Sequence, residues 1–71
     1  MVRLLNKNLV EINPGEIIEE IVIEEEIFFF FTKITTYRKV HGEVFRYKEG
    51  RYKKLSVLDW EIKYYFELPL E

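Results

Sequence analysis

Residues 16–37, EIIEEIVIEEEIFFFFTKITTY, decide the fold that the sequence predicts. β-branched and aromatic side chains fill this stretch, and these residue types favour strands over helices. We expect one strand at residues 17–23, an exposed turn or bulge at the three glutamates 24–26, and a second strand at residues 27–37. A helix over residues 16–26 is the alternative, but a glutamate would fall on its apolar side.

Four consecutive phenylalanines, Phe28, Phe29, Phe30 and Phe31, lie within the second expected strand. Side chains alternate along a strand, so two of these rings point to each face of the sheet. A chain of 71 residues has little left to cover the second face, and an exposed apolar strand promotes association. We therefore expect these phenylalanines to form the interface of a homo-oligomer, most simply a symmetric dimer. The alternative is that residues 16–23 cover the second face within the monomer.

The flanking segments predict further short strands. Pro14-Gly15 is the clearest turn signal, and a short apolar stretch ends just before it. Apolar and mostly polar residues alternate over residues 60–68 until Pro69, which predicts a strand with one buried face. The total is five to seven short strands. We expect a single all-β domain, residues 1–71, in which an antiparallel meander closes into a small barrel or sandwich.

Residues 43–57 predict a hairpin for which two registers compete. A two-residue loop at Glu49-Gly50 requires a positive φ at Glu49 and sets like charges directly opposite each other. A three-residue loop places Gly50 alone at the left-handed position and brings Tyr47 opposite Arg51. We prefer the three-residue loop.

The composition limits the kinds of site that the chain can form. It has no cysteine, one histidine and three scattered glycines, which excludes disulfides, thiolate or histidine-rich metal sites and a glycine-rich phosphate loop. The longest apolar run is five residues, whereas a membrane span needs about 20, and the N-terminal residues do not resemble a signal peptide. We expect a soluble, cytoplasmic protein without cofactor or metal. The lack of alanine and glutamine and the excess of glutamate fit a thermophile or its virus, although an AT-rich genome gives a similar bias.

Catalysis is not indicated by any spacing of reactive side chains. Ser56, His41 and Asp59 are the only residues of their types, but Ser56 lacks the flanking glycines of a nucleophile elbow. Glutamates are numerous enough for a carboxylate pair, yet a domain of this size has little room for the cleft that such a pair needs. We therefore expect that the protein is not an enzyme.

Charge is distributed unevenly along the chain. Residues 9–27 contain seven glutamates and no Lys or Arg, whereas residues 32–57 contain eight Lys and Arg against two glutamates. Aromatic rings lie among these bases, and single-stranded nucleic acids bind such surfaces through cation–phosphate contacts and base stacking. The candidates for such a basic and aromatic surface are Tyr37, Arg38, Lys39, Arg46, Lys48, Arg51, Tyr52, Lys53 and Lys54.

The net charge of −2 argues against nucleic acid and favours mutual neutralisation of the acidic and basic tracts, within the chain or across a dimer. We expect a small non-catalytic interaction module that self-associates through apolar β surface and binds another macromolecule, such as a protein partner. The alternative is a small β-barrel that binds nucleic acid through residues 37–54. An enzyme built on the glutamates comes third.

Overall fold

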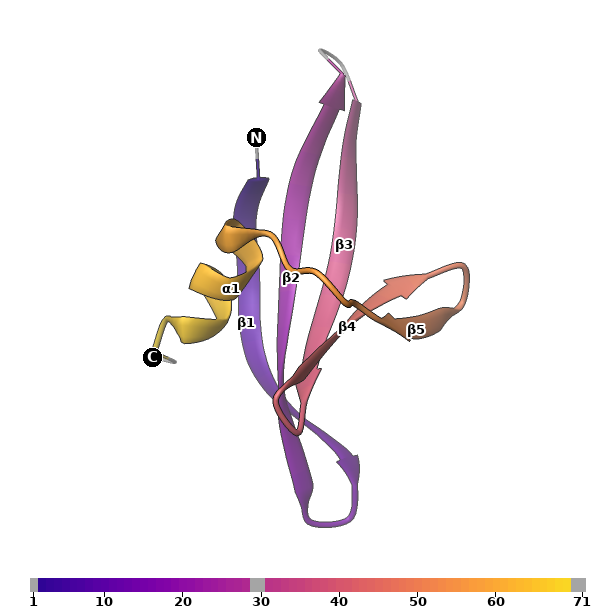
Figure 1. The fold of residues 1–71 in the computed structure, drawn as a ribbon, viewed down its shortest axis with the longest axis vertical. Coiled ribbons are helices and arrows are strands. Elements are labelled where there is room, and N and C mark those ends of the chain that lie inside the picture. The colour runs from indigo at the N-terminus through magenta and orange to yellow at the C-terminus, as the bar shows by residue number, and fades with distance from the viewer. Residues whose placement is uncertain (1, 29–30, 70–71) are drawn as a thin grey trace.

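The structure is a computed structural model that describes residues 2–28 and 31–69 (Figure 1). It is an antiparallel meander with a C-terminal helix: β1 (Val2–Asn13), β2 (Glu16–Phe28), β3 (Phe31–Val40), β4 (Glu43–Lys48), β5 (Arg51–Lys54) and α1 (Trp60–Glu67). The strand order in the sheet follows the chain, so β1 and β5 form its two edges. The expected turn at Pro14-Gly15 joins β1 to β2. A mostly β fold is thus confirmed, whereas closure into a barrel or sandwich is wrong.

The expected strand at residues 60–68 is also wrong, because α1 occupies this segment. Ile62 and Phe66, 3% and 5% exposed, are four residues apart, a spacing that suits one side of a helix as well as one face of a strand. Trp60 and Tyr64 lie on the outer side of the helix, 74% and 53% exposed. The helix covers one face of the sheet. The additional strand that could have helped to close the sheet into a barrel does not form.

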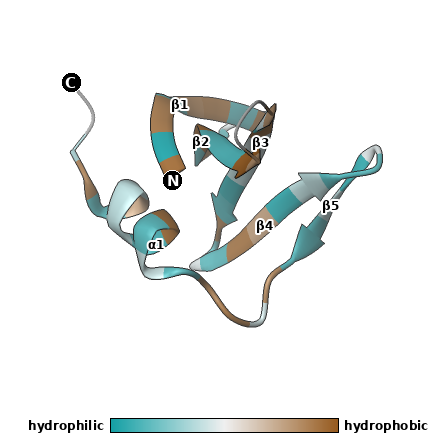
Figure 2. Ribbon diagram, turned by 90° about the horizontal axis from the view of Figure 1, so that it is seen from above, coloured by the Kyte–Doolittle hydropathy of each residue, from teal (hydrophilic) through white to brown (hydrophobic). Residues whose placement is uncertain are grey.

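The core lies between α1 and the face of the sheet that we call the helix face (Figure 2). Ile21 and Ile23 of β2 are at its centre, 0% and 1% exposed. Ile21 lies opposite Tyr37 of β3, and the core cluster is completed by Val44, Ile62 and Phe66. Burying each isoleucine contributes about 1.5–3 kcal/mol. The opposite side, the open face, has no helix on it in the described residues.

Phe28 ends β2 and Phe31 begins β3, so these two residues lie on the two strands of a hairpin and not inside one long strand as expected. β2 continues through Glu24–Glu26 to Phe28, which pairs directly with Phe31 of β3, and the ladder shifts register between Glu26 and Phe28. The three glutamates are therefore strand residues, and neither the turn expected there nor the alternative helix at 16–26 forms. Phe29 and Phe30 lie outside the described residues. The β1–β2 pairing ends at Glu25, so this hairpin extends past β1.

The β4–β5 hairpin adopts the register that we did not prefer. Tyr47 lies opposite Tyr52, not Arg51, so the loop is Glu49-Gly50 alone. Glu49 has φ 53° and Gly50 has φ 84°, as a type I′ turn requires, and the twist of this turn matches that of the strands. The two tyrosine rings pack edge to face with centroids 5.0 Å apart, a contact worth about 0.5–1.5 kcal/mol that offsets the strain at Glu49.

Candidate functional site

The observed register separates the cations of the β4–β5 hairpin from its aromatic rings. Arg46 lies opposite Lys53, and Lys48 lies opposite Arg51. These four residues alternate with the tyrosine pair, so they share one face, which continues the helix face beyond the buried Val44. We call Arg46, Lys48, Arg51 and Lys53 the basic face. Phe45, Tyr47, Tyr52 and Lys54 form the opposite, aromatic side of the hairpin.

Ion pairs neutralise other cations of the chain but none on the basic face. Arg38 and His41 join the basic tract to the acidic tract through Glu20 and Glu16. The ion pairs of the described residues are Arg3–Glu24, Lys7–Glu19, Arg38–Glu20, His41–Glu16 and Lys54–Glu43, at 2.9 to 3.8 Å. Within residues 2–28 and 31–69, no carboxylate lies within 4.0 Å of a basic-face nitrogen. Neutralisation inside the chain is therefore incomplete: it includes Lys54 of this hairpin but not the four cations of the basic face.

Arg38 and Tyr52 are occupied with each other on the open face. The Arg38 Nε lies 2.9 Å from a Glu20 carboxylate oxygen, and its guanidinium carbon lies 4.4 Å from the centre of the Tyr52 ring. Burial raises the pKa of the Tyr52 hydroxyl, and the Arg38 charge opposes that rise. One face of the Tyr52 ring is thus covered, which leaves Tyr47, 47% exposed, as the more accessible ring of the hairpin.

A shallow hollow of about 170 Å³ lies beside this pair. Its lining is otherwise apolar and consists of Ile12, Ile18, Val40 and Phe45. Pockets for drug-sized ligands are usually about 300–1,000 Å³, so this hollow is small. The Arg38–Glu20 ion pair is satisfied internally, and the Tyr52 hydroxyl is the other titratable group of this lining.

Two other sequence candidates belong to the helix face. Tyr37 is 7% exposed in the core, where burial raises the pKa of its hydroxyl and the Arg46 charge opposes that rise. Lys39 lies opposite Glu19 on β2 and Val44 on β4. The structure therefore divides the predicted basic and aromatic surface: it groups four cations on one face, buries Tyr37, and places Arg38, Tyr52 and Lys54 on the other face.

The end of the β2–β3 hairpin is a second distinct surface, which we call the phenylalanine tip and define as Ile27, Phe28 and Phe31. These side chains are 49%, 67% and 65% exposed, respectively. The Phe28 and Phe31 rings touch edge to face with centroids 6.5 Å apart. Large apolar side chains gathered at one exposed place make the tip a candidate interaction site. Of the four predicted interface phenylalanines, the structure describes only these two.

Comparisons with known proteins add nothing to these surfaces. No protein-family model, curated protein or solved structure matches this chain. In the described part of the chain, no helix is long and apolar enough to cross a membrane. Nor do three or more Asp, Glu or His side chains among those residues gather as metal ligands would.

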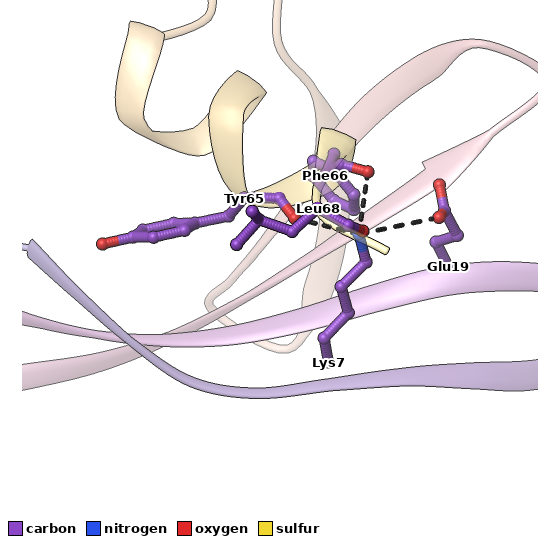
Figure 3. Close-up of polar contacts among 5 residues, drawn as sticks. All are labelled: Lys7, Glu19, Tyr65, Phe66 and Leu68. Carbon is purple, nitrogen blue, oxygen red and sulfur yellow. Dashed lines mark hydrogen bonds and ion pairs between the residues drawn. The ribbon is translucent and has the colours of Figure 1, made fainter. Parts of the chain in front are cut away.

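Lys7 is a residue that the sequence analysis missed (Figure 3). Its Nζ donates hydrogen bonds to the carbonyl oxygens of Tyr65 at 2.9 Å, Phe66 at 2.8 Å and Leu68, and it lies 3.8 Å from Glu19. The last carbonyls of a helix lack partners within it, and they favour a positive charge. Because α1 has no basic residue in its last turn, Lys7 of β1 supplies that charge. Lys7 is the single basic residue between Arg3 and Lys33. That isolation was the feature of the sequence that could have singled it out.

Proposed function

We propose that this chain is a small non-catalytic interaction module that self-associates through the phenylalanine tip and binds another macromolecule. The observation that supports this is the exposure of Phe28 and Phe31 at the end of a hairpin that extends past β1. Full burial of a phenylalanine contributes about 1.5–3 kcal/mol, so the four in a symmetric dimer contribute up to roughly 6–12 kcal/mol. Association itself costs about 4–15 kcal/mol, so the dimer should be of moderate affinity.

The charges around the tip favour a second copy of the chain as its partner. Glu25 and Glu26 of β2 and Lys33 of β3 flank the phenylalanines, and none of the three has an ion pair within the described residues. A two-fold interface brings residue i against j and j against i. A tip with both signs of charge can therefore complement itself, with Lys33 of one copy beside a glutamate of the other.

A non-catalytic role is supported by the chemistry of the hollow on the open face. Apart from Arg38 and Tyr52, its lining is aliphatic or phenyl. Those two side chains contact each other, and Glu20 holds the Arg38 guanidinium. A general acid or base has to give up or accept a proton near neutral pH. The Arg38 guanidinium stays protonated, and burial raises the pKa of the Tyr52 hydroxyl above its usual value, so neither group is suited to that role.

Light scattering after size exclusion tests self-association. We expect the wild type to be a dimer at tens of micromolar and to dissociate on dilution. The double variant Phe28→Glu, Phe31→Glu should be a folded monomer, because both rings are exposed in the isolated chain. Val57→Glu is the matched control: Val57 is 83% exposed and lies away from the tip, so the dimer should persist. A wild type that is monomeric at every concentration would refute the proposal.

A further inference from the structure

The basic face of the β4–β5 hairpin carries charges that form no ion pair within the described residues, although the Arg46 charge acts on the neighbouring Tyr37 hydroxyl. Arg46 with Lys53 and Lys48 with Arg51 are directly opposed pairs of like charge, which destabilise a hairpin. Five other basic side chains, Arg3, Lys7, Arg38, His41 and Lys54, each have a glutamate within 2.9 to 3.8 Å. Four positive charges without such a partner in the described residues therefore stand together on a chain whose net charge is −2. An anionic ligand would offset this repulsion, because it attracts all four cations.

The shape of the hairpin indicates which kind of anion the basic face can bind. β3 pairs with β4 only as far as Arg46, so Tyr47 and Lys48 extend beyond it as half of a free two-stranded ribbon. Figures 1 and 2 show this ribbon projecting from the sheet on the side away from α1. A two-stranded β-ribbon fits the major groove of B-DNA, which is about 12 Å wide.

The spacing of the charges agrees with that geometry. Lys48 follows Arg46 by two residues and Lys53 follows Arg51 by two residues, which places successive cations about 6.8 Å apart along a strand. Phosphates follow one another by about 3.4 Å along the axis of each DNA strand, so this step spans two phosphates. The pairs across the ribbon can then face the two backbones of a groove.

We infer that the basic face binds the sugar–phosphate backbone of double-stranded nucleic acid. This rests on the proposed role as an interaction module and names its macromolecular partner, but it uses a surface separate from the phenylalanine tip. A single strand fits less well, because stacking platforms combine cations and rings on one surface. Here Tyr47 and Tyr52 point to the opposite side from the cations, and Arg38 covers one face of the Tyr52 ring.

Salt dependence gives the expected magnitude. Each phosphate contact on B-DNA contributes about −0.9 to the slope of log K against log salt, so four contacts give a slope near −3.6. A fourfold rise in salt would then weaken binding by roughly 150-fold. Phosphate contacts carry no sequence information, so duplexes of different sequence should bind alike.

Fluorescence anisotropy with a labelled duplex DNA of about two turns, titrated at several salt concentrations, tests the inference. The double variant Lys48→Gln, Arg51→Gln should lower the magnitude of the slope by about 1.8. The control Arg3→Gln, Lys63→Gln removes one Arg and one Lys, as the ribbon variant does, from exposed positions outside the ribbon and should leave the slope unchanged. At low salt the ribbon variant should also melt at or above the wild-type temperature, because it loses a repulsive pair.

Several outcomes would overturn the inference. One is no duplex binding at low salt, and another is an equal loss of slope in the ribbon variant and its control. If the protein bound single-stranded DNA more tightly than the duplex, and Tyr47→Ala abolished that binding, the bases would be stacking on Tyr47 instead. Equal retention by polyglutamate would show a surface for acidic proteins. The tip variant Phe28→Glu, Phe31→Glu separates the two proposals: if it is monomeric and still binds duplex with the slope expected per chain, each surface acts alone.

Discussion

Replacing Lys7 by methionine tests whether one buried ammonium holds α1 against the sheet. The side chain is 7% exposed, and its Nζ is the donor to three carbonyl oxygens at the end of the helix, those of Tyr65, Phe66 and Leu68. Methionine keeps an unbranched apolar stem of similar length, so the variant removes mainly the charge and its hydrogen bonds. The carbonyls then have to find water at the edge of the core.

The magnitude follows from counting what the ammonium does. A hydrogen bond to a charged group contributes about 1.5–3 kcal/mol net, and a cation at a helix C-terminus adds about 0.3–1 kcal/mol. Three bonds to one ammonium do not add in full, and burying the ammonium carries its own desolvation cost. We therefore expect a loss of about 2–4 kcal/mol in the free energy of unfolding. For a domain of this size each kcal/mol lowers the melting temperature by about 4–8 °C.

Urea and thermal denaturation followed by circular dichroism measure this loss. Lys63→Met is the matched control, because Lys63 is an exposed lysine on the same helix, and its effect should stay within about 0.5 kcal/mol. Glu19→Gln should cost less than about 1 kcal/mol, since its carboxylate lies 3.8 Å from the Lys7 ammonium and is partly exposed. A Lys7→Met protein as stable as the Lys63→Met control would refute the assigned role of Lys7.

Other substitutions test the core and the turn. Burial raises the pKa of Tyr37 above its usual value near 10. The contribution of Tyr37 to the free energy of unfolding is therefore complete below pH 10 and declines as the pH rises through the folded-state pKa. Tyr37→Phe should flatten that alkaline decline, measured by urea titrations at several pH values. Glu49→Asn should raise stability by about 1 kcal/mol, because asparagine tolerates the positive φ of 53° better. Gly50→Val should destabilise by at least about 1–2 kcal/mol at φ 84°, and a wild-type melting temperature would contradict the turn geometry. Ile21→Ala should cost about 2–5 kcal/mol in equilibrium unfolding, and a loss below 1 kcal/mol would show that the site collapses around the cavity.

The sequence predicted the strands best where local chemistry decides the conformation. Pro14-Gly15 can hardly continue a strand, and β-branched residues at 17–23 favour one, so the turn and β2 were found. Residues 60–68 were misread because Ile62 and Phe66 are compatible with both periods. Only the tertiary structure, in which α1 lies across the helix face and Lys7 binds its last carbonyls, distinguishes the two.

The sequence identified the residues of the candidate surfaces but not which of those residues share a face of the sheet. The basic tract is visible in the sequence, yet the division of cations from rings depends on the loop length of one hairpin. A shift of one residue in register moves a side chain to the other side of a strand pair, and the choice between a two-residue and a three-residue loop sets that register. We weighed the strain at Glu49 and the like-charge pairs against the two-residue loop, and we did not count the Tyr47–Tyr52 contact that favours it.

The same division shows why a net charge of −2 is a poor guide to what this chain binds. Neighbouring strands are about 4.8 Å apart, so the glutamates of β2 lie two strand spacings, or roughly 10 Å, from β4 and farther from β5. The Debye length at physiological salt is about 8 Å, so those carboxylates are largely screened from the basic face. Several of them are also paired with Arg3, Arg38 or His41. An approaching polyanion therefore meets the four cations of the ribbon and the single Glu49 of its loop, not the average charge of the molecule, and this local field is what the salt titration would measure.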